Sequence, residues 1–136
     1  MSGRINDKIE EIEEYLNELS EYAPATLEDY LGNQRTQRAC ERLFEIIMEA
    51  IIDLVFIFIN EKEMDMPEDD ESALSTLIKK EIISTELGKK LREARRMRNI
   101  VAHKYGSVNP SLVYEAVSGN LNKDVMEFLE VIRRKL

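Results

Sequence analysis

Apolar residues recur at helical spacing over most of the chain. In residues 3–20, Ile or Leu stands at every third or fourth position with acids between them, which is typical of an amphipathic helix. A longer helix is predicted over 33–60. Its second half is apolar on most sides, so we expect the bundle and a second subunit to cover it. Four acids form a narrow stripe on it at i+4 spacing: Glu41, Glu45, Glu49 and Asp53. We expect this stripe to face solvent; the alternative is that it lines a cleft and orients cations.

Helix caps and breakers divide the rest of the chain. Thr26 heads a short helical turn that Gly32 ends, and the acid-rich segment 61–71, with its proline, is the clearest loop. Ser84 is an N-cap candidate, Gly106 a stop, and Asn109-Pro110 a helix start with a kink expected at Gly119-Asn120. These signals predict helices over residues 72–83, 84–104 and 109–134. The fold class is therefore an all-α, up-and-down bundle of four or five main helices in a single domain, 1–136.

Composition supports that assignment and limits the compartment. Hydrophobic residues make up 43% of the chain and charged residues 34%, with only 5 Gly and 3 Pro, which favours a globular helical protein. The single cysteine, Cys40, excludes an internal disulfide and a cysteine-based metal cluster. No signal peptide is visible, and the apolar stretch 46–59 is too short and too charged to span a bilayer. We expect a cytoplasmic protein with no membrane contact.

The charge is unevenly distributed. The net charge is −8, yet the segment from Lys89 to Lys104 holds seven basic residues and one acid, Glu93, for a local charge of +6. The rest of the chain must carry −14. A basic segment on an acidic body can bind phosphate locally, although a solvated helix face is the alternative interpretation.

The only histidine, His103, stands at the end of this basic segment. Histidine is the side chain that exchanges a proton near neutral pH. Metal-independent RNA cleavage needs a base for the ribose 2′-OH and a cation for the charge that builds on phosphorus, and it leaves a 2′,3′-cyclic phosphate. A histidine and an arginine supply both groups. The alternative is that His103 simply caps the helix or interacts with its dipole.

Helix geometry constrains how such a pair can work. Asn99 and His103 share a face, whereas Arg98 and His103 lie about 140° apart on a regular helix. Either the helix loosens before Gly106 or a second subunit completes the pair, and we prefer the dimer. Arg96 lies about 20° from His103. It therefore competes with Arg98 for the catalytic role or helps to bind phosphate.

Three segments resemble one known family. Residues 98–105 match the pattern Arg-x4-His-x-Tyr, with the polar Asn99 directly after the arginine. Residues 40–53 resemble the family's long central helix, and residues 108–114 resemble the entry to its last helix. In order and spacing, most of residues 35–130 is similar to the HepT-like branch of the HEPN superfamily.

The resemblance implies a specific function. Family members are all-α homodimers whose paired motifs form a composite, metal-independent RNase site. Arg98 and His103 would be the catalytic pair, and Asn99 a helper that orients them. Tyr105 matches the residue to which a minimal nucleotidyltransferase antitoxin attaches AMP, and charged groups there would repel an RNA phosphate. The expected partners are RNA, a second copy, and that antitoxin, in a hetero-oligomer. No cofactor or metal is implied.

Two other functions remain open at this point. Proteins of this fold also act as non-catalytic substrate-binding partners of nucleotidyltransferases, and a helical scaffold without a site is a third interpretation. No Gly-rich phosphate loop is present, so we do not expect the chain to bind ATP by itself. No Cys/His cluster indicates zinc, and no second histidine is available for a hydrolase triad.

Overall fold

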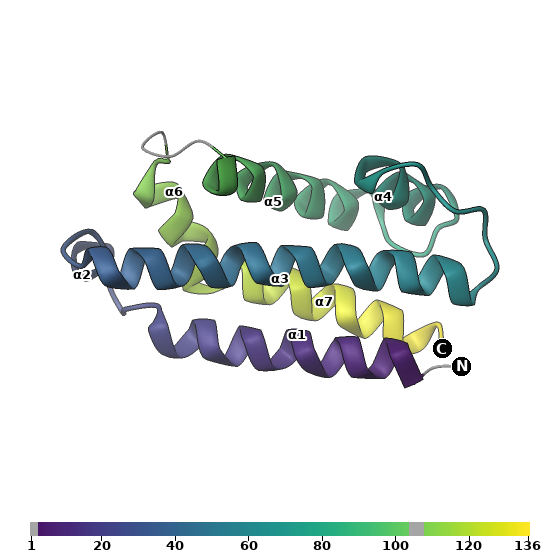
Figure 1. Ribbon diagram of the computed structural model, residues 1–136, viewed down its shortest axis with the longest axis horizontal. Coiled ribbons are helices and arrows are strands. Elements are labelled where there is room, and N and C mark those ends of the chain that lie inside the picture. Colours follow the sequence, from purple (N-terminus) through teal and green to yellow (C-terminus); the bar gives the residue numbers. More distant parts are fainter. Residues whose placement is uncertain (1–2, 104–107) are drawn as a thin grey trace.

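The chain folds into a bundle around one long central helix (Figure 1). The computed structural model describes residues 3–103 and 108–136. Within these residues every regular element is helical, which confirms the all-α prediction. The five longer helices are α1 (Gly3–Tyr22), α3 (Gln34–Glu61), α4 (Asp70–Lys79), α5 (Thr85–His103) and α7 (Leu121–Arg134). The shorter elements are α2 (Leu27–Leu31), α6 (Pro110–Glu115) and the π-helical segment η1 (Ala116–Asn120).

The core follows the predicted apolar stripes. The five apolar positions of α1 are all buried against its neighbours, at 3% exposure or less: Ile5, Ile9, Ile12, Leu16 and Leu19. Helix α3 packs between α1 and α5, and its large side chains Phe44 and Phe58 are fully buried. Three apolar side chains of α3, Ile46, Phe56 and Ile57, remain only half-buried in the single chain. One chain therefore covers most of the central helix, as its apolar character requires.

Side-chain caps fix the starts of the helices. Thr26 Oγ1 accepts a hydrogen bond from the Asp29 amide at 3.1 Å, and Ser84 Oγ accepts one from the Leu87 amide at 3.0 Å. Asn109 Oδ1 does the same for the Ser111 amide at 3.0 Å. Each bond satisfies an amide that has no partner within its helix. These three predicted starts are confirmed.

The predicted helix 72–83 is shifted in the structure, where α4 spans Asp70–Lys79. Asp69 caps its start by accepting the Ser72 amide at 2.8 Å. At its end Glu81 adopts a left-handed conformation (φ 57°), and the Ile82 amide bonds back to Leu77 O at 2.9 Å. This is a Schellman ending, which usually has glycine at the left-handed position. Because glutamate occupies that position, the sequence carried no stop signal there.

The last predicted helix is divided near the expected kink. Gly119, within η1, adopts φ 153° and breaks the helical path between α6 and α7, and glycine adopts this conformation without a steric penalty. Before the kink, Tyr114 donates a hydrogen bond to Pro24 O at 2.8 Å and packs its ring on Tyr30, with centroids 5.2 Å apart. These contacts hold α6 against α2, at the end of the bundle opposite the two chain termini (Figure 1). Among the described helices, none has both the length and the apolar character needed to cross a bilayer.

Candidate active site

Helix α5 carries the basic segment and is anchored on one face. Leu87, Gly88 and Leu91 are buried at the start of this helix. Gly88 permits a close crossing with α4, because a Cβ built on it would lie 2.7 Å from Ile78 Cγ1. The crossing places the acidic first turn of α4 beside the middle of α5.

That acidic turn neutralises part of the basic segment. Arg92 Nε lies 2.6 Å from Glu71 Oε1, and Arg95 lies 3.5 Å from Asp70 and 3.8 Å from Glu71. On another face, Lys90 Nζ lies 3.7 Å from Asp124 of α7 and 3.8 Å from Glu86. Three of the seven basic residues thus have intramolecular partners. The local charge of +6 therefore overstates how many cations of the segment are available to bind a phosphate.

The remaining cations of the described helix are free of such pairs. Lys89, Arg96 and Arg98 make no ion pair with any residue that the structure describes, and Lys104 lies outside those residues. Lys89 and Arg96 are exposed. Arg98 is half-buried, and its Nε atom is buried without a hydrogen-bond partner in residues 3–103 and 108–136. A partly buried guanidinium without an acidic partner is a candidate for binding a ligand anion.

The structure brings the predicted residues to one end of the molecule without pairing them. Helix α5 continues through His103, so the alternative of a helix that loosens is not observed up to that residue. Arg98 and His103 therefore keep their separation of about 140° around the helix axis. His103 is exposed, and Asn99, one turn earlier, is half-buried. Tyr105 and Gly106 lie outside the described residues.

The acidic stripe of α3 has its own partners. Asp53 lies 3.8 Å from Lys8 of α1, and Glu45 lies 3.0 Å from Arg42. Glu49 and Asp53 are exposed as expected, whereas Glu41 and Glu45 are half-buried. Burial raises the pKa of Glu41, and the neighbouring Glu45 raises it further. No ion pair among the described residues joins this stripe to α5, so the structure gives no support to the cleft alternative.

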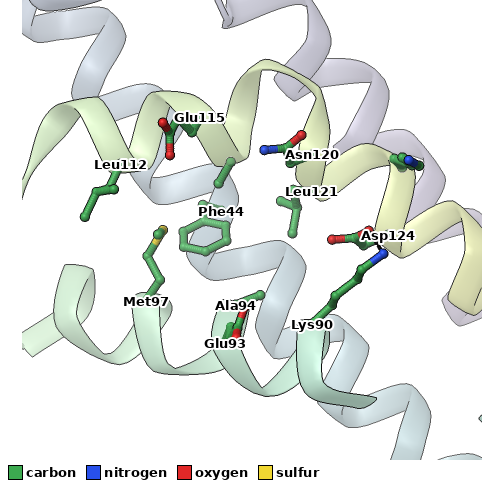
Figure 2. Close-up of a pocket in the computed structure, with 12 residues that line it drawn as sticks. Phe44, Lys90, Glu93, Ala94, Met97, Leu112, Glu115, Asn120, Leu121 and Asp124 are labelled. Atoms are coloured by element: carbon green, nitrogen blue, oxygen red, sulfur yellow. Dashed lines mark ion pairs between the residues drawn. The ribbon is translucent and has the colours of Figure 1, made fainter. Parts of the chain in front are cut away.

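A pocket of about 410 Å³ lies beside the candidate residues, between α5, α6, η1 and α7 (Figure 2). Figure 2 shows the Phe44 ring at its floor with Met97 and Leu112 alongside, and the Lys90–Asp124 ion pair at its edge. Neither Arg98 nor His103 lines this pocket. Hydrophobic periodicity does not reveal this pocket, because apolar pocket residues follow the same helical spacing as core residues.

The described residues include no group of three or more His, Cys, Asp and Glu side chains placed to hold a metal ion. Fold and site thus define a helical protein with a half-buried arginine and a lone histidine at one end of a basic helix. A model of the Ribonuclease HepT-like family matches residues 12–132. Because this match spans most of the chain, the protein belongs to that family.

Relatives and solved structures are consistent with this membership. The chain is 29% identical over 114 residues to a protein named tRNA nuclease HepT from Aphanizomenon flos-aquae, covering 84% of this chain and 78% of the relative. The fold of this chain matches that of a tri-AMPylated Shewanella oneidensis HEPN toxin in complex with an MNT antitoxin, with a TM-score of 0.90 and 21% identity. The match covers 98% of this chain and 99% of the toxin. The fold also matches that of the Bacillus subtilis cytosolic protein YutE, with a TM-score of 0.79 and 16% identity. The match covers 98% of this chain and 88% of YutE.

Proposed function

We propose that this protein is a ribonuclease toxin that cleaves RNA without a metal ion, with Arg98 and His103 as its catalytic pair. One observation carries the proposal. Among the arginines of α5, Arg98 is half-buried yet has no acidic partner in the described part of the chain, and it stands five residues before the only histidine. Family membership supports the assignment, because the matched region 12–132 includes both residues.

The chemistry needs only groups that these two side chains supply. His103 takes the proton from a ribose 2′-OH, whose oxygen then attacks the adjacent phosphorus. The bond to the 5′-oxygen breaks and that oxygen takes up a proton, so the products carry a 2′,3′-cyclic phosphate and a 5′-hydroxyl. The Arg98 guanidinium stabilises the extra negative charge on the phosphoryl oxygens. Asn99, on the same face as His103, orients the imidazole.

The working unit is a homodimer. On an unbroken helix the two catalytic side chains point about 140° apart, so Arg98 of one copy is proposed to act with His103 of the other. Five of the large exposed apolar side chains lie on α1, α2, α5 or α6: Tyr22, Leu27, Leu31, Ile100 and Leu112. Of these, Ile100 stands between Arg98 and His103 on α5, where a second copy would bury it.

The proposed antidote is a minimal nucleotidyltransferase that transfers AMP to the Tyr105 hydroxyl. The Shewanella toxin of the same fold is described as tri-AMPylated and in complex with an MNT antitoxin. Tyr105 stands two residues after His103. Each AMP group adds negative charge and bulk next to the catalytic imidazole, which would exclude an RNA phosphate. A hetero-oligomer of toxin and antitoxin follows from this arrangement.

The first experiment measures cleavage of unfractionated tRNA in EDTA at low salt, with Tyr105 shown by mass spectrometry to be unmodified. We expect the wild type to leave 2′,3′-cyclic phosphate ends. His103→Ala and Arg98→Ala should each lower the rate by about 10²-fold or more. The matched control is Arg95→Ala, which removes the same side chain from the ion-paired part of α5. Cleavage by neither the wild type nor the control would refute the nuclease and favour the non-catalytic binding partner.

A second experiment tests the composite site. Arg98→Ala and His103→Ala chains are co-expressed so that mixed dimers form. In a mixed dimer one site keeps both groups and the other lacks both. Random pairing should therefore restore about a quarter of the wild-type activity. No restoration, despite mixed dimers seen by native mass spectrometry, would place the catalytic pair within one chain.

A further inference from the structure

Three side chains form a straight line along the solvent face of α5. Lys89, Arg96 and His103 are spaced seven residues apart, so successive members drift by only about 20° around the helix axis and rise by about 10 Å along it. All three are exposed. We call these residues the α5 line. It extends about 21 Å from the catalytic histidine toward the start of the helix.

The two cations of this line differ from their sequence neighbours in what surrounds them. Lys89 and Arg96 make no ion pair within residues 3–103 and 108–136, whereas Lys90 and Arg95 are held by Asp124 and Asp70. Figure 2 shows Lys90 reaching across the pocket edge to Asp124. Helix geometry, rather than residue type, thus divides two pairs of adjacent cations into available and occupied members.

One acid lies near the line. Glu93 is the only acid between Lys89 and Lys104, it is exposed, and it forms no ion pair in the described part of the chain. Around the helix axis it lies about 40° from Lys89 and about 60° from Arg96. It weakens the positive potential of the line without neutralising either cation directly.

We propose that Lys89 and Arg96 bind separate backbone phosphates of a single-stranded RNA that leads away from His103. This rests on the proposed ribonuclease function and deepens it by naming the surface that holds the substrate. It also assigns the two neighbouring arginines different roles, with Arg98 in catalysis and Arg96 in binding. A protein partner is less suited to the line, since lysine is depleted at protein interfaces and the line has no aromatic or aliphatic side chain to fill a partner's pocket.

The experiment uses two matched pairs of variants, Lys89→Gln against Lys90→Gln and Arg96→Gln against Arg95→Gln. Every variant loses one positive charge, so long-range effects on RNA are equal within a pair. The binding probe is a fluorescent 2′-O-methyl oligoribonucleotide of mixed sequence, which cannot be cleaved through a 2′-OH. Its Kd is measured over a salt series with the unmodified full chain. Single-turnover cleavage of tRNA at saturating protein provides the second readout.

We expect Lys89→Gln and Arg96→Gln to weaken binding about threefold each at low salt. Each should also make the slope of the logarithm of the association constant against the logarithm of the salt concentration shallower by about 0.7, as loss of one phosphate contact on a single strand requires. Lys90→Gln and Arg95→Gln should leave the slope unchanged. Cleavage rates at saturation should stay close to wild type for the two controls, Lys90→Gln and Arg95→Gln. Glu93→Gln should tighten binding, because it removes the one nearby negative charge.

Each other outcome overturns a distinct part. Absence of both binding and cleavage by the wild type would overturn the proposed function and the phosphate-binding line with it. An equal loss of RNA affinity for both members of each matched pair would refute phosphate binding by the α5 line and leave the proposed ribonuclease function standing. A lower saturated cleavage rate for Arg96→Gln at unchanged Kd would make Arg96 catalytic. Unchanged RNA binding with a weakened complex to a nucleotidyltransferase antitoxin would make the line a protein-docking surface.

Discussion

The two parts of α5 carry the same residue types in opposite surroundings. In the middle of the helix, Arg92 and Arg95 are tied to Asp70 and Glu71, the acids that begin α4. One turn further on, Arg98 makes no ion pair with any acid of the described structure, and its Nε atom is buried without a hydrogen-bond partner there. The difference arises because α4 crosses α5 near Gly88 and does not extend to the last turns of α5.

This comparison teaches how to interpret a run of positive charge. Arginines that meet acids of the same chain contribute structure, and an exposed pair of this kind typically contributes little stability. Arginines beyond the reach of those acids keep their full capacity to bind an anion. A count of basic residues cannot separate the two groups, whereas the position of the crossing helix does.

Changing the crossing itself should have the largest effect on stability. In Gly88→Ala the new Cβ would collide with the Ile78 side chain, which we expect to cost about 1–3 kcal/mol, offset in part by up to about 1 kcal/mol of improved helix propensity. Urea unfolding measures the change. Gly3→Ala is the control, since nothing lies within 4 Å of the position of its Cβ.

A second background tests whether the collision with Ile78 causes the loss of stability in Gly88→Ala. In an Ile78→Ala background the collision is removed, so Gly88→Ala should become neutral or stabilising through helix propensity alone. Equal destabilisation in both backgrounds would show that the α4–α5 crossing does not depend on this close approach.

Removing the acid that distinguishes the two parts of α5 should have an intermediate effect. Glu71→Gln breaks the contacts to Arg92 and Arg95, and it should lower the free energy of unfolding by about 1 kcal/mol or less, with a smaller difference at high salt. Arg92 loses its acidic partner while Arg95 keeps Asp70, so RNA binding at low salt should tighten by more than the control Glu68→Gln produces. Glu68 is an exposed acid of the preceding loop with the same charge. Identical RNA affinity for Glu71→Gln and Glu68→Gln would show that the acids of α4 do not limit RNA binding by the middle of α5.

The smallest effect on stability should come from Glu41, an acid of α3 that makes no ion pair with α5 in the described structure. Burial and Glu45 raise the pKa of Glu41, so its charged form destabilises the folded state above that pKa. Glu41→Gln should therefore increase stability at neutral pH, by about 0.5 kcal/mol or less. The gain should disappear as the pH falls and Glu41 becomes protonated. Thermal unfolding at several pH values tests this against Glu49→Gln, on the exposed part of the same stripe. A gain that grows toward acid pH would have the wrong sign.

The sequence by itself determined the helices, their caps and the kink, because each depends on residues within one or two turns. Apolar spacing located the core face of α1, and Ser84 and Asn109 marked their helix starts through bonds to amides two or three residues away. The lone histidine and the arginine five residues before it also required no tertiary information to be singled out. Local signals failed at Glu81, where a left-handed residue other than glycine ends α4.

Only the tertiary structure decided which of the basic residues are available. Arg92 and Glu71 are separated by some twenty residues of chain, and no periodicity predicts that they meet. The pocket floored by Phe44 likewise depends on how α5, α6 and α7 are placed relative to one another. Helix formation is governed by bonds and contacts between residues a few positions apart, whereas ion pairs and cavities depend on the packing of helices far apart in sequence.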